Sequence, residues 1–165
     1  MTEIRHDLKP PALDPATVLV KAGSDYPEPF RAAVAARERR ALGDALGLTN
    51  FGVNLTRLPP GCASAQRHWH SKQDEFVYIV AGEVVLVTDG GEQVLRAGQA
   101  AGFPAGARNG HQLINRSARD ALYLEVGDRS AGDTCDYPDI DMLVRWIDGV
   151  EIYVHKDGTP YPGQE

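Results

Sequence analysis

Short segments in which apolar and polar residues alternate fill the middle of the chain, and they limit the fold more than any other sequence feature. In the first segment, Phe51, Val53 and Leu55 alternate with smaller or polar residues. Such alternation places the apolar side chains on one face of a β-strand. Turn residues separate it from further predicted strands at 66–70, 75–80, 84–88, 93–96, 112–115, 121–126 and 151–155. Many short strands at this spacing predict an antiparallel, all-β barrel or sandwich.

The regions on either side of these strands differ from them in composition. Residues 1–29 contain five prolines, which remove backbone donors and fix φ, so we expect an extended N-terminal arm. Residues 30–48 are rich in alanine and arginine and predict either a short helix or a strand that leads into the barrel. We expect the barrel core at 49–127 and a C-terminal extension that packs on it at 128–165.

Composition and charge indicate a single globular domain. The chain has 165 residues, 42% of them hydrophobic and 24% charged, and it can bury a core without disulfides. Its net charge of −6 disfavours sequence-independent binding to nucleic acid. No stretch has the pattern of a membrane span or an export signal, so we predict a cytoplasmic protein. Cys62 and Cys135 are then expected to be reduced, and neither is assigned a role.

Three of the five histidines fall inside the strand-rich region, near an acidic residue. His68 and His70 leave the same face of a strand about 6.6 Å apart. After a bend, Glu75 opens the next strand and can meet both imidazoles. A fourth ligand must come from a more distant segment, and His111 is the remaining interior histidine. Three nitrogens and one oxygen suit one divalent transition metal, namely Fe, Mn, Co, Ni, Cu or Zn, and leave positions open for water, dioxygen or substrate.

At these residues the sequence resembles the cupin superfamily, which carries two short motifs. The first motif is similar to Gly61, His68, His70, Glu75 and Gly82, with one extra residue before His68. The second is similar to Gly98, Pro104-Ala105-Gly106, His111 and Asn115, with four residues rather than two between Gly106 and His111. The resemblance covers about residues 51–126. It implies a double-stranded β-helix, or jelly-roll, barrel with the metal on its inner wall, and it assigns no substrate.

Four further residues are candidates for a substrate pocket. Gln66 shares the strand parity of His68, and Phe103 stands directly before the proline of the second motif. Tyr123 and Glu125 alternate with apolar neighbours. Their side chains therefore face either the pocket, where they can supply an acid or a base, or the solvent.

Strand parity also predicts what lies on the outside of the barrel. Aromatic side chains that point away from the metal are expected at Trp69, Phe76 and Tyr78. Outward aromatic residues often pack against a second subunit, so we expect a homodimer. A basic cluster flanked by acidic residues is expected to be a solvated face and not an anion site: Arg37, Arg39 and Arg40.

Together these features favour a metal-dependent enzyme that acts on a small, polar, oxygen-rich molecule, with Glu75 as the catalytic carboxylate that tunes the charge of the ion. Dioxygenase chemistry and isomerase or lyase chemistry both remain open. A second class is a ligand-binding or sensing module without turnover. A third is a metal-free sugar epimerase or isomerase in which histidine and tyrosine transfer protons.

Overall fold

A computed structural model describes residues 8–147 and 150–164, and the regular secondary structure in these ranges is mostly β-strand. The largest sheet has the order β1-β2-β3-β10-β5-β8, with bounds Val20–Ala22, Glu38–Ala41, Phe51–Leu58, Ala121–Asp128, Glu75–Ala81 and Ala100–Phe103. A three-stranded sheet has the order β7-β6-β9, with bounds Gly91–Arg96, Glu83–Thr88 and Gln112–Ile114. A four-stranded sheet has the order β13-β12-β11-β4, with bounds Val150–Val154, Met142–Ile147, Cys135–Tyr137 and Trp69–His70. The helical elements are the 3-10 helices Pro15–Thr17 and Ala32–Val34 and the α-helix α1, Leu42–Ala45.

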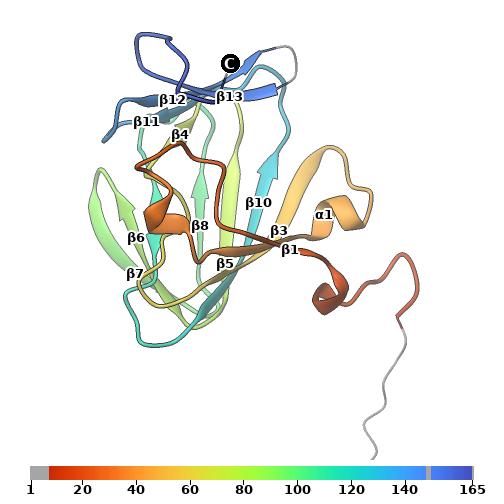
Figure 1. Ribbon diagram of the computed structural model, residues 1–165. Helices are drawn as coiled ribbons and strands as arrows, with labels where there is room; N and C mark the ends of the chain where they lie inside the picture. The colour runs from red at the N-terminus through yellow and green to blue at the C-terminus, as the bar shows by residue number, and fades with distance from the viewer. Residues whose placement is uncertain (1–7, 148–149, 165) are drawn as a thin grey trace, which may run out of the picture.

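The sheets enclose a barrel whose upper end is covered by the C-terminal strands (Figure 1). The strand pairs among the described residues are antiparallel, and β10 lies between β3 and β5 in the largest sheet. Val77 and Ile79 of β5 are buried in one cluster with Val84 and Leu86 of β6, which joins the two sheets through their apolar faces. The all-β, double-stranded β-helix barrel predicted from the sequence is therefore confirmed.

A second buried cluster joins the two ends of the chain. Tyr26, from the predicted arm, packs edge-on against Tyr137 and Tyr153 of the four-stranded sheet, with ring centroids 5.7 and 5.5 Å apart. Val34 and Met142 are fully buried in the same cluster. The N-terminal segment thus forms one wall beneath the C-terminal sheet. Residues 1–7 of the predicted arm lie outside the described residues.

Some predicted boundaries differ from the structure. The strand predicted at 66–70 is reduced to β4, because the backbone N–H of Gln66 donates to the hydroxyl of Tyr26 instead of to a neighbouring strand. The two alternatives considered for residues 30–48 both occur, since β2 lies between short helical turns. None of the described helices has the length and apolar character of a membrane span.

Candidate metal centre

Separate segments bring the four predicted site residues to the inner wall of the barrel. His68 and His111 face each other across an antiparallel bridge, in which the His68 N–H donates to the His111 carbonyl at 3.1 Å and the reverse bond measures 2.8 Å. His70 lies in β4, opposite Cys135 of β11. Glu75 is the first residue of β5. The bridge explains why two histidines that are distant in sequence meet.

The carboxylate of Glu75 lies at the focus of the three imidazoles. Its Oε2 is 2.8 Å from Nε2 of His111, 3.5 Å from Nε2 of His70 and 3.6 Å from Nε2 of His68. This oxygen is buried and has no hydrogen bond of good geometry with the described residues. Ligand atoms that share one ion at about 2.1 Å, at angles near 90–110°, lie about 3.0–3.4 Å apart. The ligand atoms of His68, Glu75 and His111 all lie within 4.8 Å of one another, so these three side chains suit one shared transition-metal ion. His70 is close to Glu75 but falls in a second group, with His68 and Cys135.

Hydrogen bonds orient two of the rings so that their Nε2 lone pairs face Glu75. Nδ1 of His68 donates to the carbonyl of Gln66 at 2.8 Å. Nδ1 of His70 donates to Oδ2 of Asp133 at 2.6 Å. In each ring the proton is thus held at Nδ1, and Nε2 is left as an acceptor or a metal ligand.

The electrostatics of the cluster favour a charged Glu75. Burial alone would raise the pKa of Glu75, but its contacts with His111 and His68 hold that pKa well below its usual range. Burial alone would lower the pKa of His68, but the neighbouring Glu75 carboxylate raises it above the usual value. Burial lowers the pKa of His111, so this ring favours the neutral form. Divalent metals take a charged carboxylate together with imidazoles whose ligand nitrogen carries no proton, so an ion would have to displace any second proton that His68 holds.

A cavity of about 300 Å³ opens from these residues toward the rim of the four-stranded sheet. Three of the four residues predicted for a pocket line it: Phe103, Tyr123 and Glu125. The ring of Phe103 is stacked on His111, with centroids 3.6 Å apart and planes 5° apart. Burial and the nearby Glu125 raise the pKa of Tyr123 well above its ordinary value, so its hydroxyl stays protonated. This phenol is 3.4 Å from a carboxylate oxygen of Glu125.

The prediction for Gln66 needs correction. Gln66 is not among the residues that line the cavity, and its side-chain amide donates to the carbonyl of Phe30 at 2.8 Å. The parity with His68 fails because Gln66 lies before β4 and outside any strand.

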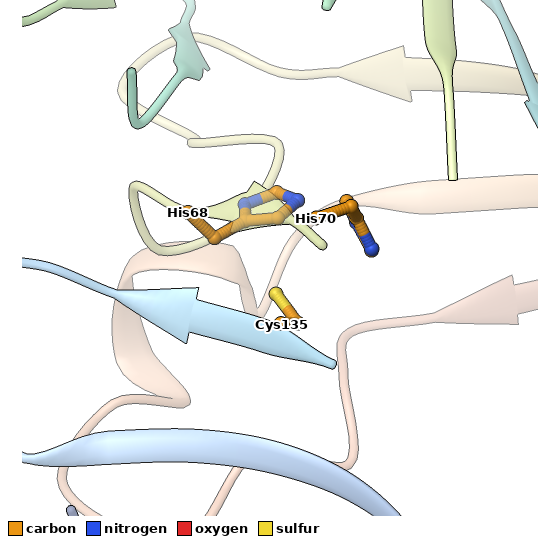
Figure 2. Close-up of side chains that lie close together, drawn as sticks. All are labelled: His68, His70 and Cys135. Atoms are coloured by element: carbon orange, nitrogen blue, oxygen red, sulfur yellow. The ribbon is translucent and has the colours of Figure 1, made fainter. Parts of the chain in front are cut away.

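Two residues near the histidines were not recognised in the sequence. Figure 2 shows Cys135 with its sulfur directed toward the rings of His68 and His70, and the three potential ligand atoms lie within 4.8 Å of one another. Burial raises the pKa of the Cys135 thiol well above its ordinary value, which keeps the sulfur protonated. Asp133 is also buried and holds His70. Neither residue belongs to a local pattern, since both reach the site only through the folding of the C-terminal segment.

The fold and the inward-facing cluster of three histidines and one glutamate define a barrel of the double-stranded β-helix class with a candidate metal site. The family model for the cupin domain matches residues 54–127. The chain belongs to the cupin superfamily, as the comparison with solved structures also shows.

One similar solved structure is that of a protein from Silicibacter pomeroyi, described as a sugar phosphate isomerase from a cupin superfamily. Its sequence is 44% identical to this chain. The match covers 94% of this chain and 99% of that protein, with a TM-score of 0.88. A provisionally named sugar phosphate isomerase from Acidithiobacillus ferrooxidans is 28% identical over 77% of this chain and 81% of its own, with a TM-score of 0.70. The polyketide cyclase RemF of Streptomyces resistomycificus shares the fold alone, at 18% identity, 71% and 78% coverage and a TM-score of 0.57. Among curated proteins, no sequence matches this chain.

Proposed function

We propose that this chain is a metal-dependent isomerase that interconverts the aldose and ketose forms of a sugar phosphate. The observation that carries the proposal is the position of Glu75 Oε2, which lies between three imidazole nitrogens at the inner end of a cavity of about 300 Å³. Among the reaction classes left open by the sequence, the 44% identical protein named as a sugar phosphate isomerase favours isomerisation.

His68, His70, Glu75 and His111 would hold one divalent ion of the series from Mn to Zn. When bound, the ion would act as a Lewis acid on a carbonyl oxygen of the sugar. The orphaned Oε2 of Glu75 and the two rings with protons fixed at Nδ1 support this assignment. The stacking of Phe103 on His111 covers one face of that ring and restricts its orientation.

Glu125 is the residue that we propose for proton transfer. Its Oε1 accepts a hydrogen bond from Nδ2 of Asn54 at 3.0 Å, and Oε2 is near the hydroxyl of Tyr123. Isomerisation removes a proton from the carbon beside the carbonyl and returns it to the former carbonyl carbon, while the adjacent hydroxyl proton moves to the old carbonyl oxygen. One fixed carboxylate can carry the carbon proton in both directions, and no atom is gained or lost.

Metal content and isomerisation test the proposal together. The protein, purified without a histidine tag and incubated with each candidate metal, should retain about one ion per chain. A panel of aldose phosphates in D₂O, followed by ¹H NMR, should show conversion to the ketose with deuterium beside the carbonyl. Glu125→Gln should lower kcat by about 100-fold or more without loss of the metal. Glu92→Gln is the control, because Glu92 pairs with Arg116 on the outside of the barrel.

These measurements, together with oxygen consumption and sugar phosphate binding, separate the alternative functions. Oxygen consumption with the Fe(II)-loaded protein and no isomerisation would replace the proposal with a dioxygenase. Retained metal and saturable binding of a sugar phosphate without turnover would indicate a binding or sensing protein. Turnover with less than about a tenth of an equivalent of metal would indicate a metal-free isomerase. The cytoplasmic location and the lack of nucleic-acid binding stay predictions.

A further inference from the structure

The wall of the cavity also carries a group of cationic side chains, two of them on β1 and β2 at one edge of the largest sheet. Three basic residues line this wall: Lys21, Arg37 and Arg39. All three come from the N-terminal segment, which precedes the region of residues 54–127 matched by the family model. They therefore belong to the part of the chain that is added to the common barrel.

The sheet register explains why Arg39 faces the cavity. Arg39 of β2 lies between Lys21 of β1 and Thr56 of β3, and the same row continues to Tyr123 of β10. Thr56 and Tyr123 are fully buried inside the barrel. The next residue, Arg40, lies in the alternate row and is not among the cavity residues. Arg39 therefore faces the cavity, whereas Arg40 faces the other side of the sheet.

Among the described residues, the three cations differ in their partners. The guanidinium of Arg37 donates to the carbonyl of Ser64, and to that of Gly23 at 2.8 Å. These two hydrogen bonds stabilise the backbone of neighbouring loops and use donors of Arg37. Lys21 forms an ion pair with Asp25. Arg39 is half-buried and has neither a hydrogen bond nor an ion pair from its side chain to a described residue. Arg39 is therefore a cavity cation whose donors are uncommitted.

The carboxylates on the cavity wall form no ion pair with Arg39, although its charge helps to lower the pKa of Asp25 after the larger effect of Lys21. Asp25 is engaged with Lys21, and Glu125 accepts from Asn54. Glu151 also lines the mouth and forms no ion pair with Arg39 within 4 Å. A planar guanidinium with free donors binds the paired oxygens of a phosphate in a bidentate manner.

We propose that Arg39, assisted by Lys21, binds the phosphate group of the substrate at the mouth of the cavity. The inference rests on the proposed function, and it names the group that recognises the phosphorylated end of the sugar. Arg39 lies three strands from β5, about 14 Å across the sheet, and its row meets β5 at Ile79, four residues or about 13 Å along the strand from Glu75. The long Arg39 side chain and the histidine side chains shorten this separation inside the cavity. One elongated molecule can therefore place its phosphate at Arg39 and its carbonyl end at the histidines. This assignment replaces the expectation that Arg39 lies on a solvated face.

Phosphate binding without catalysis tests the subsite directly. Inorganic phosphate is titrated calorimetrically into the protein as purified and after removal of metal by a chelator, so that binding to an ion is separated from binding to Arg39. The wild-type protein should bind phosphate in both states. Arg39→Met should weaken binding by about tenfold or more in both states, and Arg39→Lys should recover part of it. Lys21→Met should weaken binding by a smaller factor, because Asp25 already offsets the Lys21 charge.

Arg40→Met is the matched control, since it removes the same charge from the neighbouring position of the same strand. It should leave phosphate binding within about twofold of the wild type, and thermal unfolding of every variant reports whether the fold is retained. Equal binding by Arg39→Met and the wild type would overturn the subsite, as would an equal loss in Arg40→Met. Acetate is the second probe. If acetate binds in a manner that depends on Arg39 and phosphate does not bind, the ligand group at Arg39 is a carboxylate. That result would overturn the inference.

The inference and the proposed function can fail separately. If Arg39 governs phosphate binding but no aldose phosphate is isomerised, the subsite stands and the reaction class is wrong. If isomerisation occurs and Arg39→Met changes neither phosphate binding nor KM, the reaction class stands and the subsite is wrong.

Discussion

At the scale of single residues, Asp133 links the ring of His70 to the rest of the fold. Its carboxylate is buried and accepts from Nδ1 of His70, from the hydroxyl of Ser71 at 3.1 Å and from the N–H of Lys72 at 2.7 Å. The backbone of the β4–β5 bend and the imidazole are therefore positioned by one side chain. Such partners beyond the ligands themselves set the ring orientation and the basicity of the ligand nitrogen.

Asp133→Asn is predicted to weaken metal binding by about 10- to 100-fold, because it removes the negative charge beside the His70 ring and one acceptor of its network. Competition with a chromophoric chelator measures the affinity. Asp128→Asn is the control, since Asp128 accepts from the backbone N–H groups of Asp74 and Ser130 and does not contact the histidines. Equal metal affinity in Asp133→Asn and wild type would show that this carboxylate does not support the site.

Metal uptake is predicted to rise with pH through the titration of His68. The pKa of His68 is raised above its usual value of 6.5 in the folded, metal-free protein, so a bound proton stabilises that form at pH values below 6.5 and this contribution is lost as the pH rises through the raised pKa. A metal ion must displace the same proton. The increase in melting temperature caused by Zn²⁺ should therefore be larger at pH 8 than at pH 5.5. An equal increase at both pH values would contradict the assignment of His68 as a ligand.

At the scale of elements, the sequence predicts strands well where one face is buried and the other is exposed. The alternating patterns predict β3 and β10, and apolar runs bounded by turn residues predict β5 and β6. The strand β8 was missed because Ala100 and Gly102 have little β propensity, and it forms through pairing with β5. The strands β11 and β12 were missed because they follow turn residues. The strand β11 pairs with β4, which is far away in sequence, and β12 then pairs with β11.

The residues of the candidate site also fall into two groups, those that the local sequence predicts and those that it does not. The four clustered residues were predicted because His68, His70 and Glu75 are close in sequence and His111 lies beside a strand. Residues that join from the flanking segments carry no local signal. Asp133 depends on the path of the C-terminal extension, and Arg39 faces the cavity only because β2 pairs with β3. These positions depend on which distant strands pair with each other. The periodicity of residues within one segment carries no information about that pairing.

The turn between β5 and β6 is predicted to require a glycine for two separate reasons. Gly82 has φ of +74°, and a Cβ atom there would lie 2.7 Å from the carbonyl oxygen of Asp120. Gly61 has a similar φ of +80° but has nothing within 4 Å of the same position. Gly61→Ala should therefore lower the free energy of unfolding by about 1 kcal/mol, the cost of the left-handed backbone alone. Gly82→Ala should lower it by about 2–4 kcal/mol, because the clash adds to that cost.

Urea denaturation of the two variants measures the difference. The comparison is internally controlled, since both substitutions add one methyl group at a turn with positive φ. Equal losses in the two variants would mean that the backbone of Asp120 moves away at no cost.

At the scale of the whole molecule, the outer face of the six-stranded sheet is apolar at its centre, on β5, β10 and β3, and carries Arg40 and Arg57 toward its edge. Phe76, Tyr78 and Val80 of β5 are 44%, 40% and 42% exposed. Leu124 and Val126 of β10 lie opposite Tyr78 and Phe76 in the same sheet. Val53 and Leu55 of β3 extend this surface, because they lie opposite Val126 and Leu124. A contiguous apolar face of this kind marks an interaction surface more often than single exposed residues do.

We propose that two copies of the chain associate through this face as a homodimer. The wild-type protein should have a mass of about twice 17.9 kDa by light scattering coupled to size-exclusion chromatography. Tyr78→Glu should raise the dimer dissociation constant by about 100-fold or more, because each protomer would bury an unpaired carboxylate.

Val94→Glu is the control, since Val94 is 43% exposed on β7 in another sheet. A wild-type monomer at all concentrations, or a Tyr78→Glu protein that remains dimeric, would contradict the proposal. Because the cavity lies on the other side of this sheet, the Tyr78→Glu monomer should retain its metal.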